Sequence, residues 1–249
     1  MYKRQVLIRA DAAWTPGALV ELGELPGNAM AWEREVRSGS RTVRLSGVSF
    51  SARDCMFRVL DNPPDARRSL ASALAGAGAV AGINGGYFHP DFKPLGLVVA
   101  EGKELHSFER AKLLSGILTV RDNHIALVRA GDFQIGKPLQ EALQAGPWLI
   151  EGGAVIGSLN AEKQARRTLV ATDGKDHWAI VATSPLTLAE TAELLATKDL
   201  LGSWTVRDAL NLDGGSSTAL LAVAGSRPLL DIPSFGPVRN YLAIVPRHR

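Results

Sequence analysis

Two short glycine-rich blocks hold the residue types best suited to chemistry. Asn84 and Asp213 each end an apolar run and stand directly before two glycines, Gly85-Gly86 and Gly214-Gly215. Glycines allow the backbone to turn with positive φ or to approach a ligand closely with free N–H groups. A polar side chain beside bare amides suits an anionic or highly hydroxylated ligand. We therefore expect the functional site at these two blocks.

Asp213 is the best candidate for a catalytic carboxylate. It follows an otherwise apolar run, where an unpaired charge would be costly. Burial would raise its pKa and an arginine partner would lower it, so the roles of general acid, base and nucleophile are all open. An equally strong alternative is structural, with Asp213 accepting backbone N–H bonds inside its own turn.

Arginines precede two of the apolar runs. Arg166-Arg167-Thr168 leads one and Arg239-Asn240 leads another. A guanidinium offers a planar fork for a phosphate or carboxylate, and a threonine hydroxyl adds a donor. An isolated arginine pair is more typical of a solvated surface, but two such sites beside two Gly-Gly turns favour an anion site.

Other chemistries find less support. His89 follows the first block and could reach the same rim, whereas the other histidines lack metal-ligand spacing, so no metal site is predicted. Asp213 with nearby carbonyls gives only a weak case for calcium, and otherwise no cofactor is expected. Ser216 lacks the Gly-x-Ser-x-Gly setting of a serine hydrolase. The single cysteine, Cys55, lies in an apolar run and is interpreted as a buried, inert thiol.

Composition bounds the class of protein. The 249 residues carry 28 Lys+Arg against 25 Asp+Glu, a net charge of +3 that is too small and too evenly spread to indicate nucleic-acid binding. No apolar stretch reaches the roughly 18 residues of a membrane span. Residues 1–10 contain two basic residues and only a short apolar patch, so no signal peptide is predicted. The 25 glycines indicate many turns and a strand-rich fold.

The apolar patterns predict many short strands and two helices, at 65–75 and 188–200. Each helix is followed by a short buried strand, a polar-Gly-Gly turn and a hairpin, so the chain reads as two similar units. Chance similarity within a glycine-rich β protein explains the same pattern. We predict a strand-rich single domain of the α+β (mixed α/β) class, with a mixed sheet and flanking helices. Residues 1–62 are expected to form a β-rich segment packed on a main domain of residues 63–249.

Five blocks taken in order resemble the phosphodiester glycosidase family. They are Gly82-Ile83-Asn84-Gly85-Gly86-Tyr87-Phe88, Ala145-Gly146-Pro147-Trp148-Leu149, Arg167-Thr168, Asn211-Leu212-Asp213-Gly214-Gly215-Ser216-Ser217 and Arg239-Asn240. Ser216 and Ala171 stand where the family often has glycine. Neither departure removes a charged or amide group.

The resemblance implies a hydrolase that cleaves the glycosidic bond of a sugar-1-phosphodiester, of N-acetylglucosamine or hexose type, and releases sugar and a phosphomonoester. It implies catalytic roles for Asp213, Asn84 and Arg167, with Glu151 or Asp173 as a second carboxylate. The implied substrate-binding residues are Gly85, Gly86, Tyr87, Phe88, His89, Gly146, Pro147, Thr168, Gly214, Gly215, Ser216, Arg239 and Asn240.

The expected partner is a small-molecule or glycan phosphodiester. Bacterial relatives in this family are usually exported, which implies a periplasmic or secreted protein although no signal peptide is predicted here. Two alternatives remain open: a non-catalytic glycan- or peptidoglycan-binding domain, and a metal-dependent phosphodiesterase. Oligomeric state is not predicted.

Overall fold

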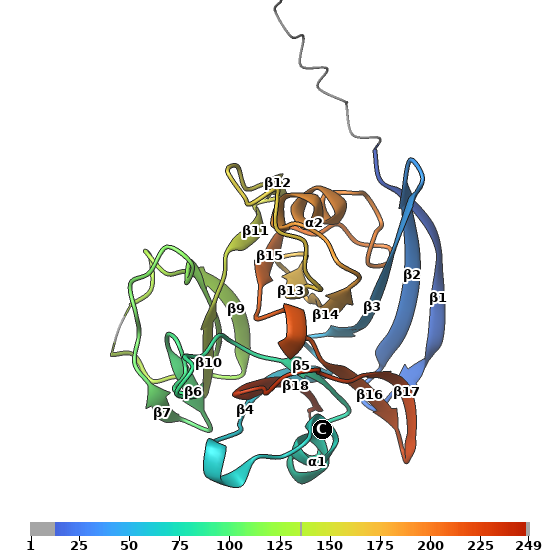
Figure 1. The fold of residues 1–249 in the computed structure, drawn as a ribbon. Coiled ribbons are helices and arrows are strands. Elements are labelled where there is room, and N and C mark those ends of the chain that lie inside the picture. The colour runs from blue at the N-terminus through green and yellow to red at the C-terminus, as the bar shows by residue number, and fades with distance from the viewer. Residues whose placement is uncertain (1–12, 135, 248–249) are drawn as a thin grey trace, which may run out of the picture.

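The protein is built from three antiparallel β-sheets around a shared interior (Figure 1). The structure is a computed structural model that describes residues 13–134 and 136–247. The first sheet has the strand order β1-β2-β3-β14-β13-β15-β11-β12. Its strands are β1 (Thr15–Leu25), β2 (Ala29–Ser38), β3 (Arg41–Ser51), β11 (Trp148–Glu151), β12 (Ala154–Val155), β13 (Thr168–Thr172), β14 (His177–Thr183) and β15 (Asp208–Asn211).

The other two sheets have five strands each. The second sheet, ordered β7-β6-β10-β8-β9, contains β6 (Val98–Ala100), β7 (Lys103–His106), β8 (Gly116–Arg121), β9 (His124–Arg129) and β10 (Glu141–Ala145). The third sheet, ordered β17-β16-β5-β18-β4, contains β4 (Cys55–Asp61), β5 (Ala81–Asn84), β16 (Leu220–Ala224), β17 (Arg227–Ile232) and β18 (Asn240–Pro246).

The helices are short. Within the described residues there are two α-helices, α1 (Leu70–Ala77) and α2 (Leu188–Leu195), and two 3₁₀ turns, η1 (Pro64–Ala66) and η2 (Gly215–Ser217). The Ser69 hydroxyl caps α1, and Thr187 begins α2 in a reciprocal capping box with Glu190. The α1 helix thus begins later than predicted, and α2 ends earlier.

The predicted α+β class with a mixed sheet is wrong. Of the residues that the structure describes, 47% are strand and 9% are helical, and the three sheets they form are antiparallel, so the fold is mostly β. The apolar runs that suggested a helix-covered mixed sheet arise instead because the central strands are buried on both faces. In β14, Trp178 and Ile180 enter the central core, whereas Ala179 and Val181 pack on the opposite face, which contacts α2. Burial on both faces, common in parallel sheets, occurs here between stacked antiparallel sheets.

The N-terminal strands are members of these sheets. β3 pairs with β14 along seven residue pairs, from His177 with Ser51 to Thr183 with Leu45, and β4 pairs with β18. The domain boundary at residue 62 remains a prediction. Residues 1–10, for which no signal peptide was predicted, lie outside the described residues. No helix in the described part of the chain is long and apolar enough to cross a membrane.

Both predicted units are present in order along the chain. α1, β5 and the hairpin β6-β7 surround the first glycine block, and α2, β15 and the hairpin β16-β17 surround the second. Their strands nevertheless belong to different sheets, since β5 lies in the third sheet and β15 in the first. The two glycine blocks therefore meet where these sheets adjoin.

Candidate functional site

Asn84 and Asp213 lie in direct contact at this junction. The Asn84 Nδ2 donates to the backbone oxygen of Asp213 at 2.6 Å and to the hydroxyl of Thr168 at 3.1 Å. The Asn84 Oδ1 accepts from the backbone N–H of Ala219 at 3.0 Å. Because Asn84 is fully buried and its amide is engaged on both ends, it braces the junction.

The Asp213 backbone is held from both sheets. Its N–H donates to the Gly85 carbonyl at 3.1 Å, and its carbonyl also accepts from the Thr168 hydroxyl. Thr168 is the first residue of β13, and its own carbonyl accepts from the N–H of Leu212 at 2.8 Å. The position of Asp213 is therefore set by β5, β13 and β15 together.

The carboxylate of Asp213 is largely shielded from solvent. Its Oδ1 accepts from the N–H of Gly214 at 2.8 Å, and the Ser217 hydroxyl also bonds to it. Burial raises the pKa of Asp213 above its ordinary value, and these two hydrogen bonds partly oppose the rise. The turn therefore contains the bond from Gly214 that is expected if Asp213 only stabilises its own turn. The charge of Asp213 nevertheless also acts on Tyr87, the centre of a polar cluster.

Tyr87 is the centre of that polar cluster. Its hydroxyl donates to the Gly146 carbonyl at 2.6 Å and accepts from Asn211 Nδ2 at 2.8 Å. Burial raises the pKa of Tyr87 strongly, the negative charge of Asp213 raises it further, and Arg167 lowers it. Asp213 and Arg167 are thus the charged residues that act on this hydroxyl, which stays protonated at neutral pH.

Arg167 brings a positive charge to the same cluster. Its Nε donates to the Leu186 carbonyl at 2.8 Å and its Nη2 to the Lys163 carbonyl at 2.6 Å. No carboxylate of the described residues lies within ion-pair distance of it. Burial lowers the pKa of Arg167 from a very high starting value, so the guanidinium remains charged. Its charge is therefore available to an anion.

The four glycine amides are occupied within the protein. Gly85 N–H donates to the Asn240 carbonyl and Gly86 N–H to the Asn240 side chain, each at 2.8 Å. Gly214 N–H donates to Asp213, and Gly215 N–H donates to the Arg166 carbonyl at 2.8 Å. These amides shape the two turns, and the cationic side chains remain as the groups suited to hold an anion.

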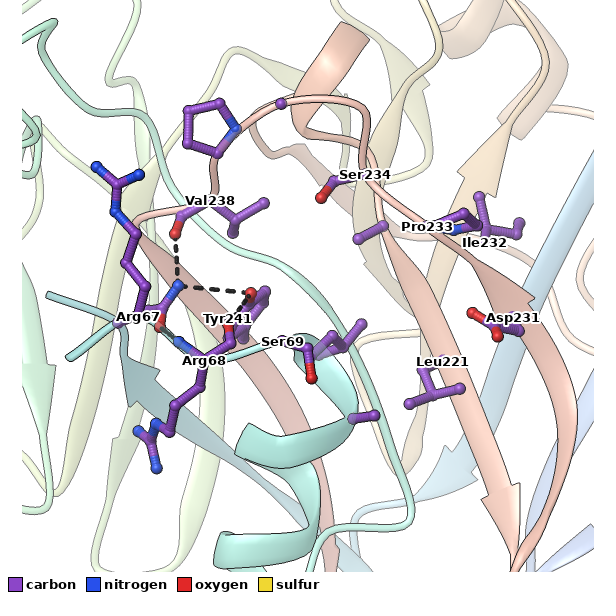
Figure 2. A pocket seen from close by; sticks show the side chains of 16 residues that line it. Arg67, Arg68, Ser69, Leu221, Asp231, Ile232, Pro233, Ser234, Val238 and Tyr241 are labelled. Atoms are coloured by element: carbon purple, nitrogen blue, oxygen red, sulfur yellow. Dashed lines mark hydrogen bonds between the residues drawn. The ribbon is translucent and has the colours of Figure 1, made fainter. Parts of the chain in front are cut away.

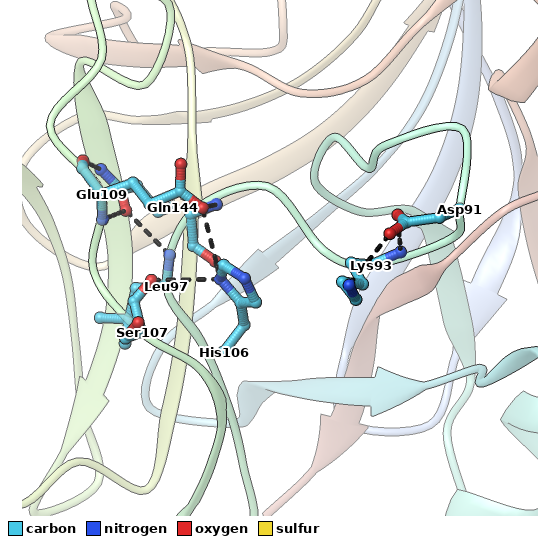
Figure 3. Close-up of polar contacts among 8 residues, drawn as sticks. Asp91, Lys93, Leu97, His106, Ser107, Glu109 and Gln144 are labelled. Carbon is cyan, nitrogen blue, oxygen red and sulfur yellow. Dashed lines mark hydrogen bonds and ion pairs between the residues drawn. The ribbon is translucent and has the colours of Figure 1, made fainter.

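The Gly146-Pro147 turn forms another wall of the cluster and contains a cis peptide bond. Gln144, just before it, is buried and binds the preceding loop: its Oε1 accepts from Leu97 and its Nε2 donates to the Glu109 carbonyl (Figure 3). After the turn, Asn211 N–H donates to the Pro147 carbonyl at 3.0 Å. The turn is thus fixed between the second sheet and β15.

Several residues predicted for the site lie apart from this cluster. Arg239 is buried in an ion pair with Asp61, on the strand next to β18. His89 is exposed in the turn 88–94, where Phe88 contacts Phe92 with ring centroids 4.9 Å apart. The ion pair of Arg239 stabilises the pairing of β18 with β4, and the contact between Phe88 and Phe92 stabilises the turn that contains His89.

The two candidates for a second carboxylate also have other partners. Glu151 forms a two-pronged ion pair with Arg129, at 2.6 and 2.5 Å. Asp173 accepts from Lys175 N–H and His177 Nδ1, both at 2.8 Å. Asp213 is therefore the carboxylate that contacts this cluster.

Two residues of the site carried no predicted role, and a third, Arg166, was considered only as part of an arginine pair. Asn211 bonds Tyr87 and Gly146, Ser217 bonds the Asp213 carboxylate, and Arg166 donates to the carbonyls of Gly215 and Thr218, each at 3.3 Å. All three stand within the sequence blocks singled out above. Each could have been recognised in the sequence as a polar residue that lies within three positions of a predicted site residue and beside an apolar run.

A cavity of about 400 Å³ lies between the start of α1 and the loop 233–238 (Figure 2). The loop 233–238 lines one of its walls, and that loop also contacts the second glycine block, because Phe235 and Gly236 donate their N–H groups to the Ser216 carbonyl. Arg67 and Tyr241 contribute other lining groups, whereas Asp213 does not line the cavity. Among the described residues, no three His, Cys, Asp or Glu side chains come together in a way that could hold a metal ion.

Comparison with known proteins assigns most of this chain to a sequence family. The model of the phosphodiester glycosidase family matches residues 77–245, more than half of the chain. No match is found among curated proteins.

Solved structures share the fold at low sequence identity. The chain is similar to the catalytic domain of zebrafish N-acetylglucosamine-1-phosphodiester alpha-N-acetylglucosaminidase, auto-inhibited by its pro-peptide, with a TM-score of 0.64, 17% identity, and coverage of 95% of this chain and 89% of that one. A hypothetical protein from Synechocystis gives a TM-score of 0.59 at 17% identity, covering 88% and 62%. A Burkholderia pseudomallei protein, provisionally described as exported, gives 0.59 at 13% identity, covering 85% and 77%.

Proposed function

The chain belongs to the phosphodiester glycosidase family, and we propose that it hydrolyses the glycosidic bond of a sugar-1-phosphodiester, releasing free sugar and a phosphomonoester. The observation that carries the proposal is that Asp213 and Arg167 belong to one site: Thr168, next to Arg167 in the chain, donates to the Asp213 carbonyl, and both charges act on the Tyr87 hydroxyl. A carboxylate and a guanidinium that both act on one neutral hydroxyl match a substrate that develops positive charge at a sugar carbon and negative charge on phosphate.

Arg167 binds the phosphate in this proposal. Its Nε and Nη2 are anchored on backbone carbonyls, and the carboxylate that acts on it, Glu190, forms its ion pair with Arg41 and not with Arg167. A guanidinium is matched in shape and charge to phosphate oxygens. Tyr87, whose pKa is raised, supplies a neutral hydroxyl beside it.

Asp213 acts at the anomeric carbon. As the C1–O bond breaks, its electron pair passes to the phosphate oxygen and C1 gains oxocarbenium character. The carboxylate of Asp213 stabilises that charge, and water then supplies hydroxide to C1 and a proton to the phosphomonoester or solvent. A phosphomonoester leaves as a stable anion with a pKa near 6, so a dedicated acid is less necessary than in ordinary glycosidases.

Asn84 and Thr168 serve as positioning residues. Both donate to the Asp213 carbonyl, so they set where its carboxylate stands. A catalytic group must be held in register with the reacting atom for its charge to act on the transition state. The name of the zebrafish neighbour makes N-acetylglucosamine the first sugar to test.

The test is hydrolysis of an N-acetylglucosamine-1-phosphodiester in ¹⁸O-labelled water, by the wild type and by Asp213→Asn, with and without chelator. We expect the label in the sugar, because the C1–O bond is the one that breaks. Asp213→Asn should reduce kcat by at least about 10³-fold. Label in the phosphate and loss of turnover with chelator would instead establish a metal-dependent phosphodiesterase, and binding without turnover would establish a glycan-binding domain.

We propose that the reaction takes place outside the cytoplasm. The description of the Burkholderia neighbour as exported supports this location. Fractionation of cells that produce the natural protein, followed by detection with an antibody, provides the test, and recovery in the cytoplasmic fraction alone would contradict it.

A further inference from the structure

Phe235 is the most exposed large apolar side chain in the described part of the chain. Its side chain is 81% exposed, and every other aromatic residue that the structure describes is buried or partly buried. Leaving an aromatic ring in water forgoes the apolar area it could bury. An exposed ring at a fixed position close to a candidate active site is therefore a candidate ligand contact.

The backbone at Phe235 is held against the turn that follows Asp213. The N–H groups of Phe235 and Gly236 donate to the Ser216 carbonyl at 2.8 and 2.9 Å. The Ser217 hydroxyl lies between two acceptors, the Asp213 carboxylate and the Pro237 carbonyl, the latter at 3.4 Å, and can donate its one hydrogen to either. The loop that presents the ring is thus linked to the carboxylate through Ser217.

One face of the ring is covered by Arg166. The Arg166 Cζ lies 4.3 Å from the ring centroid. The guanidinium is itself tied to the Gly215 and Thr218 carbonyls, and the Arg166 carbonyl accepts from Gly215 N–H. The ring is therefore supported from one side by an anchored cation, while its large exposed fraction leaves the other face open to a ligand.

The position of this pair relative to Arg167 suggests which part of a substrate it meets. Consecutive residues of an extended chain direct their side chains to opposite faces. Arg167 reaches the Leu186 and Lys163 carbonyls, whereas Arg166 reaches the glycine turn and Phe235. The turn that carries Asp213 is joined to Arg166 by the bond from Gly215 N–H to the Arg166 carbonyl, and to Phe235 by the bond from Phe235 N–H to the Ser216 carbonyl. A sugar whose anomeric carbon lies at Asp213 is therefore on the Phe235 side of the turn, and its phosphate extends toward Arg167.

We propose that Phe235, supported by Arg166, is the platform on which the pyranose ring of the substrate stacks. This inference rests on the proposed function and names the contact that holds the sugar. The apolar C–H face of a pyranose packs on an open aromatic face, while its hydroxyls remain free for polar groups. The polar cluster around Tyr87 and Arg167 would then select the phosphate, and Phe235 the sugar ring.

Binding of the two halves of the substrate tests the platform without requiring turnover. N-acetylglucosamine and inorganic phosphate are titrated separately into the wild type, Phe235→Ala and Phe235→Trp, with affinity followed by ligand-observed NMR. We expect Phe235→Ala to weaken sugar binding about 5- to 10-fold and to leave phosphate affinity within twofold. Phe235→Trp, which keeps a flat aromatic face, should retain sugar affinity. Val155→Ala is the control, because Val155 is an exposed apolar residue of β12 outside the site.

Each outcome is decisive for the platform. Equal sugar affinity in the wild type and Phe235→Ala would overturn it, as would a variant that loses phosphate and sugar affinity alike. The thermal midpoint of Phe235→Ala should match the wild type, because the side chain is exposed and the backbone bond to Ser216 is retained. Hydrolysis in labelled water reports the proposed function independently, so a protein that binds sugar through Phe235 but cleaves no diester would refute only that function.

Discussion

The side-chain amide of Asn84 donates to the backbone carbonyl of Asp213 at 2.6 Å, across the junction between the third and first sheets. The residue proposed for catalysis is therefore placed by a contact between sheets and not by its own strand alone. A change in the packing of β5 against β13 and β15 is consequently expected to move the carboxylate of Asp213 as well.

Asn84→Ala should reduce both stability and activity. The substitution removes donors to Asp213 and Thr168 and leaves the buried N–H of Ala219 without an acceptor, at a cost of about 2–4 kcal/mol in the free energy of unfolding. Urea unfolding and kcat measure the two effects. Gln140→Ala is the control, since it removes an amide that is exposed and bonded to Asn123. An Asn84→Ala variant with wild-type stability would contradict the bracing role.

Asp213 should impose an acid limit on hydrolysis. Burial raises the pKa of its carboxyl, and the proposed role needs the ionised form, so kcat/KM should rise with pH through a value above the ordinary 3.8. A raised folded-state pKa also means that ionisation costs stability as pH rises. Asp213→Asn should therefore be at least as stable as the wild type at pH 7, although inactive. The exposed Asp65→Asn serves as the control, and an acid limit below 3.8 would refute the assignment.

Arg167 and Arg239 should separate binding from stability. Arg167→Lys keeps the charge but loses the planar fork and the bonds to the Leu186 and Lys163 carbonyls, so KM for a phosphodiester should rise roughly tenfold or more with a stability loss of only about 1 kcal/mol. Arg239→Met leaves the partly buried Asp61 unpaired, which should cost about 2 kcal/mol or more with KM unchanged. Steady-state kinetics and thermal unfolding of both variants check this. A raised KM in Arg239→Met would contradict this separation and would indicate that Arg239 takes part in substrate binding.

Gly85→Ala should be poorly tolerated. A Cβ at this position would overlap Asn240 Oδ1, which is buried and accepts from Gly86 N–H. We expect a loss of about 2–4 kcal/mol, because either the bond or the backbone must move. Gly131→Ala is the matched control, since a Cβ there meets no atom within 4 Å. Equal thermal midpoints for the two variants would contradict the close approach seen at Gly85.

Glu141 should make stability fall as pH rises toward neutrality. It is buried on β10 and accepts from Val59 N–H of β4 at 2.9 Å, and burial raises its pKa to about 7. The folded state then holds the proton more tightly than the unfolded chain, so this group's contribution declines from pH near 4.5 to about 7. Glu141→Gln, which keeps an acceptor, should remove this decline and gain roughly 1–3 kcal/mol at pH 8. Urea unfolding between pH 4.5 and 8 measures it, and parallel profiles for wild type and variant would contradict it.

The approach of the two glycine blocks was foreseeable from the sequence, because each showed a polar residue at the end of a buried run. The arrangement of the sheets was not. A run such as the one in β14, apolar from Trp178 to Ala182, is equally typical of a parallel strand covered by helices and of an antiparallel strand between sheets. Only the long-range pairing of β3 with β14 distinguishes the two.

Contacts between distant segments also decide which candidate residues gather. Arg167 and Arg239 have the same sequence setting, an arginine before an apolar strand, yet Arg239 meets Asp61 on its neighbouring strand and Arg167 meets none. Nothing in the sequence around Phe235, a loop that contains proline and glycine, indicated a functional role for this residue. Its importance depends on Arg166 and Ser216, which are close to it only in the folded chain.

The internal bonding of the glycine turns has a thermodynamic consequence for recognition. Because the N–H groups of Gly85, Gly86, Gly214 and Gly215 already have partners, the loops that carry the site are ordered before a ligand arrives. A substrate would then lose its own translational and rotational entropy on binding, but the protein loops would lose little conformational entropy. The unfavourable entropy of binding is therefore smaller than for a site with disordered loops. This arrangement suits small ligands, whose few contacts leave little free energy for rearranging their host.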